Sequence, residues 1–348
     1  MSLTLEHVRQ LPKLELHRHV DGSVDPALVW ELCHEQGVQL KQANVEELRQ
    51  FLKLEAHMQM GEVMEKFGLP IQLMQNRQSI SKVFRHQVLD LHKENIIYAE
   101  LRFAPQYHTQ KGLTLDQVIQ AAVDGIDEGV QQCQGETLAK LIVSIGRECP
   151  SVESNRIVDT VLSFEKTGMV VGIDLACNEE AYPPEIHQEA YSKTFGTSIQ
   201  RTVHAGELDD ESKGRDNILS SIKNLRANRI GHGIYIPRYS DLIKLCLNHK
   251  VSVECCPVSN LVVVDSVTDM GQLYLDKLRA SSIPFSVNSD DPALFHCSLS
   301  ETLYQTAVYY GWTLYDLQQL MISTVDQTFL SQEDKSKLLT NLQSKKLV

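Results

Sequence analysis

Two histidines separated by one residue could form half of a metal site. His17 and His19 close an apolar run, and alternate side chains of a β-strand point to the same face. Both imidazoles can therefore face one point, and imidazole is a common ligand of zinc and other transition metals. The pair alone is also compatible with two ordinary polar residues at the end of a strand.

Three other apolar runs also end in histidines or carboxylates, in the segments His204-Ala-Gly-Glu207, Gly231-His232-Gly233 and Asn288-Ser-Asp-Asp-Pro292. Taken singly, such a histidine is usually a hydrogen-bonded structural residue, and Asp-Asp-Pro is usually a turn. Together the four ends supply three histidines and a carboxylate for a metal, and leave an acid, another histidine and a second carboxylate. Nitrogen and oxygen ligands without cysteine suit a catalytic zinc that keeps one position open for water.

The elements that must position these groups follow a regular alternation. Short apolar runs alternate with longer amphipathic segments, which is typical of buried parallel strands joined by helices. The runs are Leu14–His19, Ile96–Phe103, Lys140–Ile145, Val170–Leu175, Gln200–Ala205, Asn228–Gly233, Lys250–Cys255 and Ile283–Asn288. Eight such units predict a (β/α)8 barrel of the TIM type, with the active site at the C-terminal ends of the strands. An open doubly wound sheet is the alternative, but no glycine-rich phosphate-binding turn follows the first run.

Helix starts and chain organisation fit the same fold. Four residues can each cap the start of a helix: Asn44, Thr114, Thr313 and Ser331. Each is followed three positions later by an acidic residue or glutamine, as in a capping box. No linker, repeat or low-complexity segment divides the chain, so we expect residues 1–348 to form one barrel domain with extra helices. Glu100 and Arg102 alternate with apolar residues in the second run, and could form a buried ion pair with either a supporting or a purely structural role.

The composition limits the kinds of binding partner and the cellular compartment that we expect. The net charge of -12 and the pI of about 5.5 argue against a nucleic-acid partner, which usually meets a basic face, whereas a neutral small molecule needs none. No signal peptide or apolar stretch of membrane-spanning length is present. Eight scattered cysteines without a C-x-x-C pair indicate reduced thiols in a cytoplasmic enzyme. The oligomeric state is not predicted.

The motifs resemble those of the adenosine deaminase family in the metal-dependent amidohydrolase superfamily. The matching blocks, which span most of the chain, are Leu16–Ser23, Ala99–Arg102, Gly172–Ala176, Thr202–Glu207, Arg229–Gly233, Cys256–Asn260 and Ser286–Pro292. The resemblance implies one zinc ion per chain, held by His17, His19, His204 and Asp290.

The resemblance also implies a reaction. It is the hydrolytic deamination of adenosine, and of 2'-deoxyadenosine, to inosine and ammonia, a step of purine salvage. Metal-activated water would attack purine C6 while Glu207 protonates N1. Either Asp290 or His232 would orient the water or accept its proton, and the sequence leaves both open.

Substrate contacts follow from the same resemblance. Asp291 would meet the imidazole edge of the purine, in an unusual protonation state, while Asp21 would bind a ribose hydroxyl beside His19. Related adenine deaminases tend to carry Glu at the position of Asp21, and N6-modified-AMP deaminases tend to carry Asn. Asp therefore favours a nucleoside.

A helical stripe resembles the family's apolar gate over the ribose. Its members, Met60, Val63, Met64 and Phe67, recur at three- and four-residue spacing, which is equally typical of a core-facing stripe.

One position departs from the family pattern. Cys177 stands where glycine is usual, and its N–H can still meet purine N3, although its side chain and backbone limits differ from those of glycine. This keeps open another 6-aminopurine as substrate: adenine, a modified adenosine or a futalosine-type nucleoside. A catalytically inactive relative should have lost a ligand or the acid, and all of these residues are present.

Overall fold

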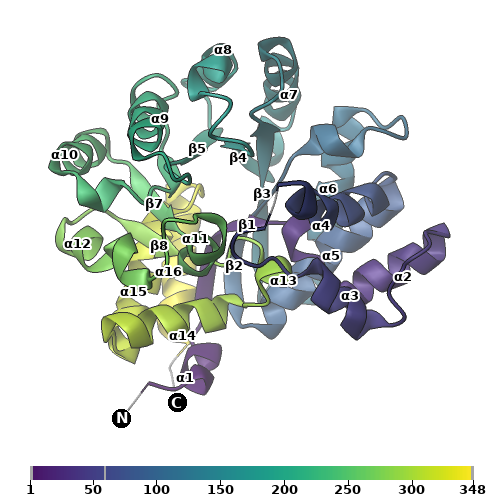
Figure 1. The fold of residues 1–348 in the computed structure, drawn as a ribbon, viewed down its shortest axis with the longest axis horizontal. Helices are drawn as coiled ribbons and strands as arrows, with labels where there is room; N and C mark the ends of the chain where they lie inside the picture. The colour runs from purple at the N-terminus through teal and green to yellow at the C-terminus, as the bar shows by residue number, and fades with distance from the viewer. Residues whose placement is uncertain (1–2, 59, 346–348) are drawn as a thin grey trace.

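The computed structural model describes residues 3–58 and 60–345, and eight parallel strands form the centre of this part of the chain. Neighbouring strands pair in chain order, and helices surround them (Figure 1). The strands are β1 (Lys13–His19), β2 (Ile96–Phe103), β3 (Leu138–Gly146), β4 (Val170–Ala176), β5 (Gln200–Ala205), β6 (Arg229–His232), β7 (Ser252–Cys255) and β8 (Phe285–Val287). The fold is the (β/α)8 TIM-type barrel that the alternation predicts.

The predicted strands all occur, with shifted ends. β2 and β5 have the predicted bounds, whereas β3 already begins at Leu138, whose side chain is 42% exposed and so adds little to a buried apolar run. β8 is shorter than predicted because its ladder with β7 covers only Phe285–Val287. The chain then bends away, so that Asn288 accepts a hydrogen bond from the backbone N–H of Leu16 on β1.

The barrel closes between its first and last strands. The amide of His19 donates to the carbonyl of Asp290 at 2.9 Å, and the amide of Asp290 donates to the carbonyl of His17 at 3.0 Å. Arg18 and Asp290 form the corresponding parallel bridge. The backbone seam of the barrel therefore passes through three of the residues expected to hold a metal.

Helices occupy every connection between strands. Their bounds are α1 (Leu5–Gln10), α2 (Pro26–Gln36), α3 (Val45–Leu52), α4 (Met60–Leu73), α5 (Arg77–Lys93), α6 (Leu115–Gln132), α7 (Ser151–Ser163), α8 (Gln188–Ser192), α9 (Glu211–Lys223), α10 (Ser240–His249), α11 (Pro257–Val263), α12 (Leu275–Ala280), α13 (Pro292–Phe295), α14 (Leu299–Tyr310), α15 (Leu314–Gln327) and α16 (Gln332–Ser344). Short 3-10 turns are η1 (Asp21–Ser23), η2 (Pro105–His108), η3 (Glu165–Thr167), η4 (Pro184–His187), η5 (Ile236–Arg238) and η6 (Met270–Leu273).

The four expected helix starts are confirmed. The side chains of Asn44, Thr114, Thr313 and Ser331 each accept the backbone N–H three residues later, at the starts of α3, α6, α15 and α16. These bonds satisfy amides that have no partner within the first helical turn.

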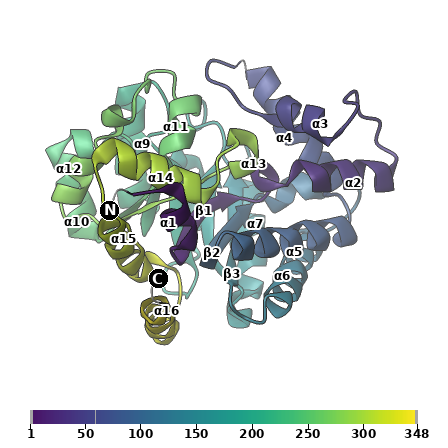
Figure 2. The ribbon, with the colours of Figure 1, turned by 90° about the horizontal axis from the view of Figure 1, so that it is seen from below.

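The two ends of the barrel are covered differently. Figure 2 shows α3, α4, α11 and α13 together on one side, with α16 on the opposite side. At the opposite end, the ring of Phe329 packs against Gly172, where a Cβ atom would come within 2.8 Å of the ring. Within the described residues, no helix is both long enough and apolar enough to cross a membrane.

Glu100 and Arg102 do not pair with each other. Glu100 instead pairs with Arg229, at 2.5 Å, and accepts from the hydroxyl of Tyr98 and the amide of Phe329. Residues two apart on β2 face the same interior but lie at different depths, so each finds partners on other strands. Arg102 lies nearer the C-terminal ends of the strands, where it contacts Glu254 and Asp174.

Candidate functional site

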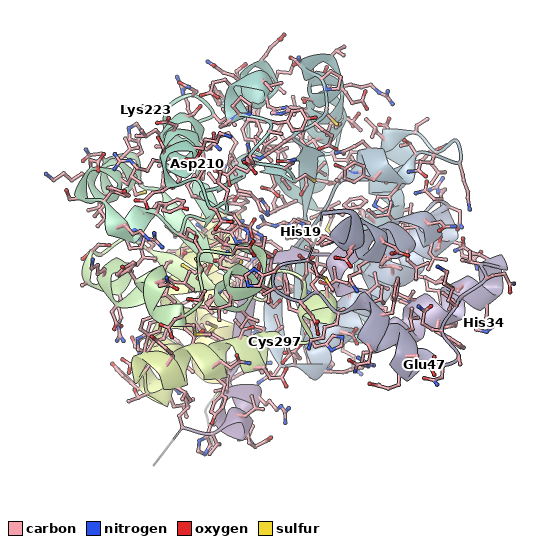
Figure 3. The ribbon with its side chains drawn as sticks, viewed as in Figure 1. His19, His34, Glu47, Asp210, Lys223 and Cys297 are labelled. Atoms are coloured by element: carbon pink, nitrogen blue, oxygen red, sulfur yellow. The ribbon has the colours of Figure 1, made fainter. Side chains whose placement is uncertain are left out.

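Four side chains from three strand ends converge on one point. Nε2 of His17 and Nε2 of His19 lie 3.1 and 3.5 Å from Oδ1 of Asp290, and Nε2 of His19 lies 3.0 Å from Nε2 of His204. All four ligand atoms lie within 4.8 Å of one another. His19 lies near the centre of the ring of helices (Figure 3), so the cluster occupies the mouth of the barrel.

Two buried carboxylates orient two of these histidines. Nδ1 of His17 lies 2.7 Å from Oε2 of Glu254, and Nδ1 of His204 lies 3.0 Å from Oδ1 of Asp174. A carboxylate can only accept from these rings, so the Nδ1 proton faces it and the Nε2 lone pair faces the cluster. Arg102 links the two carboxylates, at 2.9 Å from Glu254 and 3.5 Å from Asp174.

The charges of this layer are well matched. Burial opposes ionisation of Glu254, but the guanidinium groups of Arg102 and Arg229 hold the pKa of Glu254 well below its usual range. Burial likewise opposes ionisation of Asp174, but His204 and Arg102 lower its pKa. Both carboxylates are therefore anions that hold the histidine rings in a single tautomer.

The donor set fits a divalent metal ion. With the ring proton of His17 on Nδ1, its buried Nε2 lone pair faces Oδ1 of Asp290 at 3.1 Å without a hydrogen bond, a costly arrangement that a metal would remove. Three imidazole nitrogens and one carboxylate oxygen suit a catalytic metal site. A second grouping joins Cys256 and His232 to His17 and Asp290, but burial raises the pKa of the Cys256 thiol well above its usual range. Because the thiolate is the ligand form, this second grouping fits a metal less well.

His232 and Glu207 lie beside the cluster and contact each other. Nδ1 of His232 lies 3.1 Å from Oε1 of Glu207 and 3.0 Å from Nδ2 of Asn260. Burial lowers the pKa of His232 well below its usual range, so the ring is neutral. The amide of Asn260 donates to Nδ1, which leaves the ring proton on Nε2.

Glu207 has the environment of a carboxylic acid that retains its proton. Its side chain is only 17% exposed, on the loop after β5. Burial raises the pKa of Glu207 well above its usual range, and the negative charges of Asp290 and Glu179 raise it further. A protonated carboxyl here can donate to a nitrogen of a bound ring.

Asp291 and Asp21 lie together on the other side of the cluster. Asp291 fits against Gly22, where a Cβ atom would lie 1.6 Å from Oδ1 of Asp291, so only glycine leaves room for this carboxyl. Burial, followed by the charges of Asp290 and Asp21, raises the pKa of Asp291 well above its usual range. One carboxyl oxygen of Asp21 and one of Asp291 are buried without a hydrogen-bond partner in the described part of the chain.

Three residues at the strand ends have left-handed backbone. The φ angles of Cys177, His232 and Asp290 are 76°, 62° and 64°. Residues other than glycine rarely adopt this conformation because the Cβ atom approaches the following carbonyl, and such strain is concentrated at functional sites. The turns after β4, β6 and β8 are therefore built to aim side chains rather than to minimise local energy.

Comparisons with known proteins place this chain in a family. Residues 12–345 match the family model described as adenosine deaminase. The chain belongs to the adenosine deaminase family. An adenosine deaminase of Clostridium acetobutylicum is 31% identical over 338 residues, which cover 97% of this chain and 98% of the relative.

Solved structures share the fold. An adenine deaminase from Arthrobacter aurescens has a TM-score of 0.84 and 22% identity, covering 96% of this chain and 98% of that chain. An amidohydrolase from Burkholderia ambifaria with bound Zn has the same TM-score and 21% identity, covering 99% and 94%. Membership of the adenosine deaminase family makes the protein a hydrolase of C–N bonds, which acts by hydrolytic deamination of a 6-aminopurine.

Cys177 marks where the chain departs from the usual pattern of the adenosine deaminase family. The residue keeps the left-handed backbone that glycine adopts easily, and its Sγ atom lies 3.3 Å from the hydroxyl of Tyr107. Tyr107 also hydrogen-bonds to Glu148. Although Cys177 is open to solvent on one side, desolvation by the protein around it raises the pKa of the thiol to about 12, so it is not a reactive thiolate.

The proposed gate is only partly described. Helix α4 packs against η1, the turn that carries Asp21. Phe67 is half-buried and packs against the core, as does Val63. The side chains of Met60 and Met64 lie outside the described residues.

Four residues of the site were not assigned a role from sequence: Asp174, Glu179, Glu254 and Asn260. Asp174 and Glu254 carried a readable signal, because an acidic residue inside an otherwise buried apolar run must have a partner. Asn260 and Glu179 lie in segments that follow strands, and only the folded chain shows which side chain or amide each one contacts.

Proposed function

We propose that the protein is a zinc-dependent adenosine deaminase, which converts adenosine and 2'-deoxyadenosine to inosine and ammonia. The observation that carries this proposal is the convergence of four ligand atoms within 4.8 Å of one another. A protonated carboxyl and a neutral imidazole lie at the edge of that cluster.

One zinc ion per chain would be held by His17, His19, His204 and Asp290. Zinc, when bound, would act as a Lewis acid and lower the pKa of a coordinated water to about 7. The nitrogen-rich donor set supports zinc, as does the zinc bound in the Burkholderia amidohydrolase. Glu254 and Asp174 would keep the ligand rings oriented.

Glu207 would protonate purine N1, which makes C6 a better electrophile. Its raised pKa, caused by burial and then by the charges of Asp290 and Glu179, keeps the proton available near neutral pH. His232, with its proton on Nε2, would donate a hydrogen bond to the attacking oxygen. This arrangement supports Asp290 as the group that accepts the proton of the water.

The remaining residues would bind the nucleoside. Asp291, with its carboxyl protonated, would donate to N7, while Asp21 and His19 would contact the ribose. The backbone N–H of Cys177 would meet N3. Met60, Met64 and Phe67 on α4 would cover the sugar as an apolar gate.

This assignment fits a cytoplasmic enzyme of purine salvage whose partner is a small neutral nucleoside. Eight free cysteines and a net charge of -12 support that setting.

A second candidate is deamination of another 6-aminopurine: adenine, a modified adenosine or a futalosine-type nucleoside. The observation that favours it is the cysteine at position 177, whose Sγ atom and Tyr107 occupy space that glycine would leave open. A narrower wall there would change the fit of the purine or of its N9 substituent while leaving the reacting groups unchanged.

The test is an ultraviolet assay of adenosine-to-inosine conversion by purified protein of known metal content, with adenine in parallel. Turnover of adenosine alone, lost on chelation and restored by zinc, is the expected result. Protein that carries one zinc but is inactive on adenosine would contradict the substrate. Protein that is active on adenosine without any metal would contradict the zinc site.

A further inference from the structure

Glu179 holds the loop that carries Glu207. Its carboxylate accepts the backbone N–H of Gly206 at 2.6 Å through Oε1, and the N–H of Glu207 at 2.8 Å through Oε2. The side chain amide of Asn217 on α9 donates to the same carboxylate at 3.0 Å. Glu179 is only 6% exposed, so these bonds are shielded from water.

The loop needs a partner at this point. The β5–β6 ladder ends where Ala205 meets His232, and the chain turns through Gly206 at a φ of 78°. A Cβ atom on Gly206 would lie 2.8 Å from Ile218, so the turn packs closely against α9. The next two amides have left the sheet, and buried amides need acceptors. Glu179, reaching across from the loop after β4, supplies both.

We propose that Glu179 is a positioning residue, whose two hydrogen bonds to consecutive amides fix the backbone of Glu207 and so hold its carboxyl against His232. The inference rests on the proposed role of Glu207 as the acid of the reaction. The contact that it maintains is the 3.1 Å approach of Oε1 of Glu207 to Nδ1 of His232.

Glu179 also acts through its charge. The charged groups facing Glu207 are Asp290 from the turn after β8, Asp174 from β4, Glu179 from the loop after β4, and Arg147 from just after β3. His232 contacts Glu207 from the end of β6. Burial is the main cause of the raised pKa of Glu207, and the negative charge of Glu179 adds to it, while Arg147 opposes it. Removing the charge of Glu179 should therefore lower the pKa of Glu207.

Two substitutions separate geometry from charge. Glu179→Gln keeps the length but replaces one acceptor by an amide N–H2 group, so one loop amide loses its bond and the charge is lost. Glu179→Asp keeps the charge but is too short to reach both amides. Glu180→Gln is the matched control, since this neighbouring carboxylate is exposed and lies 3.9 Å from Lys213.

The first readout does not depend on activity. Hydrogen–deuterium exchange of the zinc-loaded protein should show the amides of Gly206 and Glu207 exchanging about 10-fold faster in both Glu179 variants than in wild type. The same amides should be unchanged in Glu180→Gln. Wild-type exchange rates in both Glu179 variants would overturn the inference.

The second readout is the pH profile of kcat/KM for adenosine. Activity should fall as pH rises through the pKa of Glu207, because the acid must be protonated. In Glu179→Gln this fall should occur at lower pH, and kcat should drop roughly 10²-fold, the cost of misplacing a reacting group by about 1 Å. In Glu179→Asp kcat should also drop, with the fall near its wild-type pH. An unmoved profile with unchanged kcat in Glu179→Gln would overturn the inference.

The two proposals fail in distinguishable ways. Wild-type protein that is inactive on adenosine would contradict the proposed function, and the exchange rates alone would then decide whether Glu179 holds the loop. Active wild-type protein with two unaffected Glu179 variants would contradict only the positioning role.

Discussion

Buried carboxyl groups in the barrel interior and those at its mouth differ in their partners. In the interior, Glu254 meets Arg229 at 2.5 Å, Arg102 at 2.9 Å and the hydroxyl of Thr202 at 2.9 Å. At the mouth, one carboxyl oxygen of Asp21 and one of Asp291 are buried without hydrogen-bond partners in the described residues, as is Nε2 of His232. Paired interior charges specify and hold the fold, whereas unpaired groups at the mouth lower stability and are available to bind a ligand.

Left-handed backbone accompanies the unpartnered groups at the mouth. The left-handed residues Cys177, His232 and Asp290 all lie at the C-terminal ends of strands, in the turns that present the site. At the mouth, strained backbone and unpartnered carboxyl oxygens therefore occur together, whereas other left-handed residues, such as Asn95 and Lys250, precede strands at the opposite end. Changes at the mouth should alter activity more than stability, and changes in the interior should do the reverse.

The largest expected effect is the loss of activity in Glu207→Gln. Because the amide cannot supply the proton, kcat/KM for the accepted purine should fall by about 10²- to 10⁴-fold. The free energy of unfolding should not fall, since glutamine removes a carboxyl whose burial near Asp290 is unfavourable. Steady-state kinetics, metal analysis and chemical denaturation check this, with Glu211→Gln as control. Full activity in Glu207→Gln would refute the assignment of the acid.

The next effect concerns the interior. Glu254→Gln should lower the free energy of unfolding by about 3–5 kcal/mol, because Arg102 and Arg229 lose their charged partner. It should also weaken metal binding by roughly 10- to 100-fold, since Glu254 orients His17. Denaturant unfolding and competition with a chelator measure the two effects.

The control for this substitution is Glu333→Gln, which breaks an exposed pair with Lys337 on α16 and should have no measurable effect. Equal effects of the two substitutions would show that the buried network does not stabilise the barrel.

A smaller, pH-dependent effect is expected at His108, away from the site. Burial lowers the pKa of His108 from 6.5 to about 4, and its Nδ1 atom lies 3.1 Å from the carbonyl of Met74. The folded state therefore favours the neutral ring. Its contribution to stability is complete above about pH 6.5, the unfolded pKa, and is lost as pH falls towards 4.

Glutamine at position 108 keeps the donor and removes this titration. Between pH 7 and 4, His108→Gln should lose less stability than wild type, by at most about 3 kcal/mol, in denaturation series at each pH. The exposed His249→Gln serves as control. Identical pH dependence in wild type and His108→Gln would contradict the buried neutral ring.

The smallest effect is expected at Cys177. Cys177→Gly should stabilise the protein by about 1 kcal/mol, because glycine adopts a φ of 76° without strain. It should also change the relative kcat/KM values of adenosine and other 6-aminopurines, if the Sγ atom and Tyr107 shape the pocket. Tyr107→Phe removes the contact with Sγ but not the backbone strain, and so should change selectivity without raising stability.

Local patterns predicted much of this molecule. All eight strands were found because buried parallel strands read as apolar runs, and the four capped helices because side chain caps act within one turn. The convergence of His17, His19, His204 and Asp290 was also predicted, since a barrel brings strand ends to one face. The ends of β3 and β8 were misplaced because exposure and barrel closure, rather than local sequence, determine where those ladders end.

Contacts across the barrel were harder to predict. The sequence suggested that Glu100 and Arg102 could form a pair, but their charged partners lie on β4, β6 and β7. The bond from Asn260 to His232 and those from the Glu207 loop to Glu179 join different connections of the fold. Such pairings depend on the depth and twist of strands far apart in the sequence. The hydrophobic periodicity of the sequence therefore does not predict them.

The closing seam between β1 and β8 also determines when the site can exist. Asp290 follows His17 by about 270 residues, and the backbone bonds that join them complete the barrel. At a ribosomal rate of about 5–20 residues per second, a nascent chain spends roughly 15 to 60 seconds with His17 and His19 made and Asp290 still unsynthesised. A fragment that ends before β8 has neither a closed barrel nor Asp290, so the four converging side chains can meet only when the barrel closes.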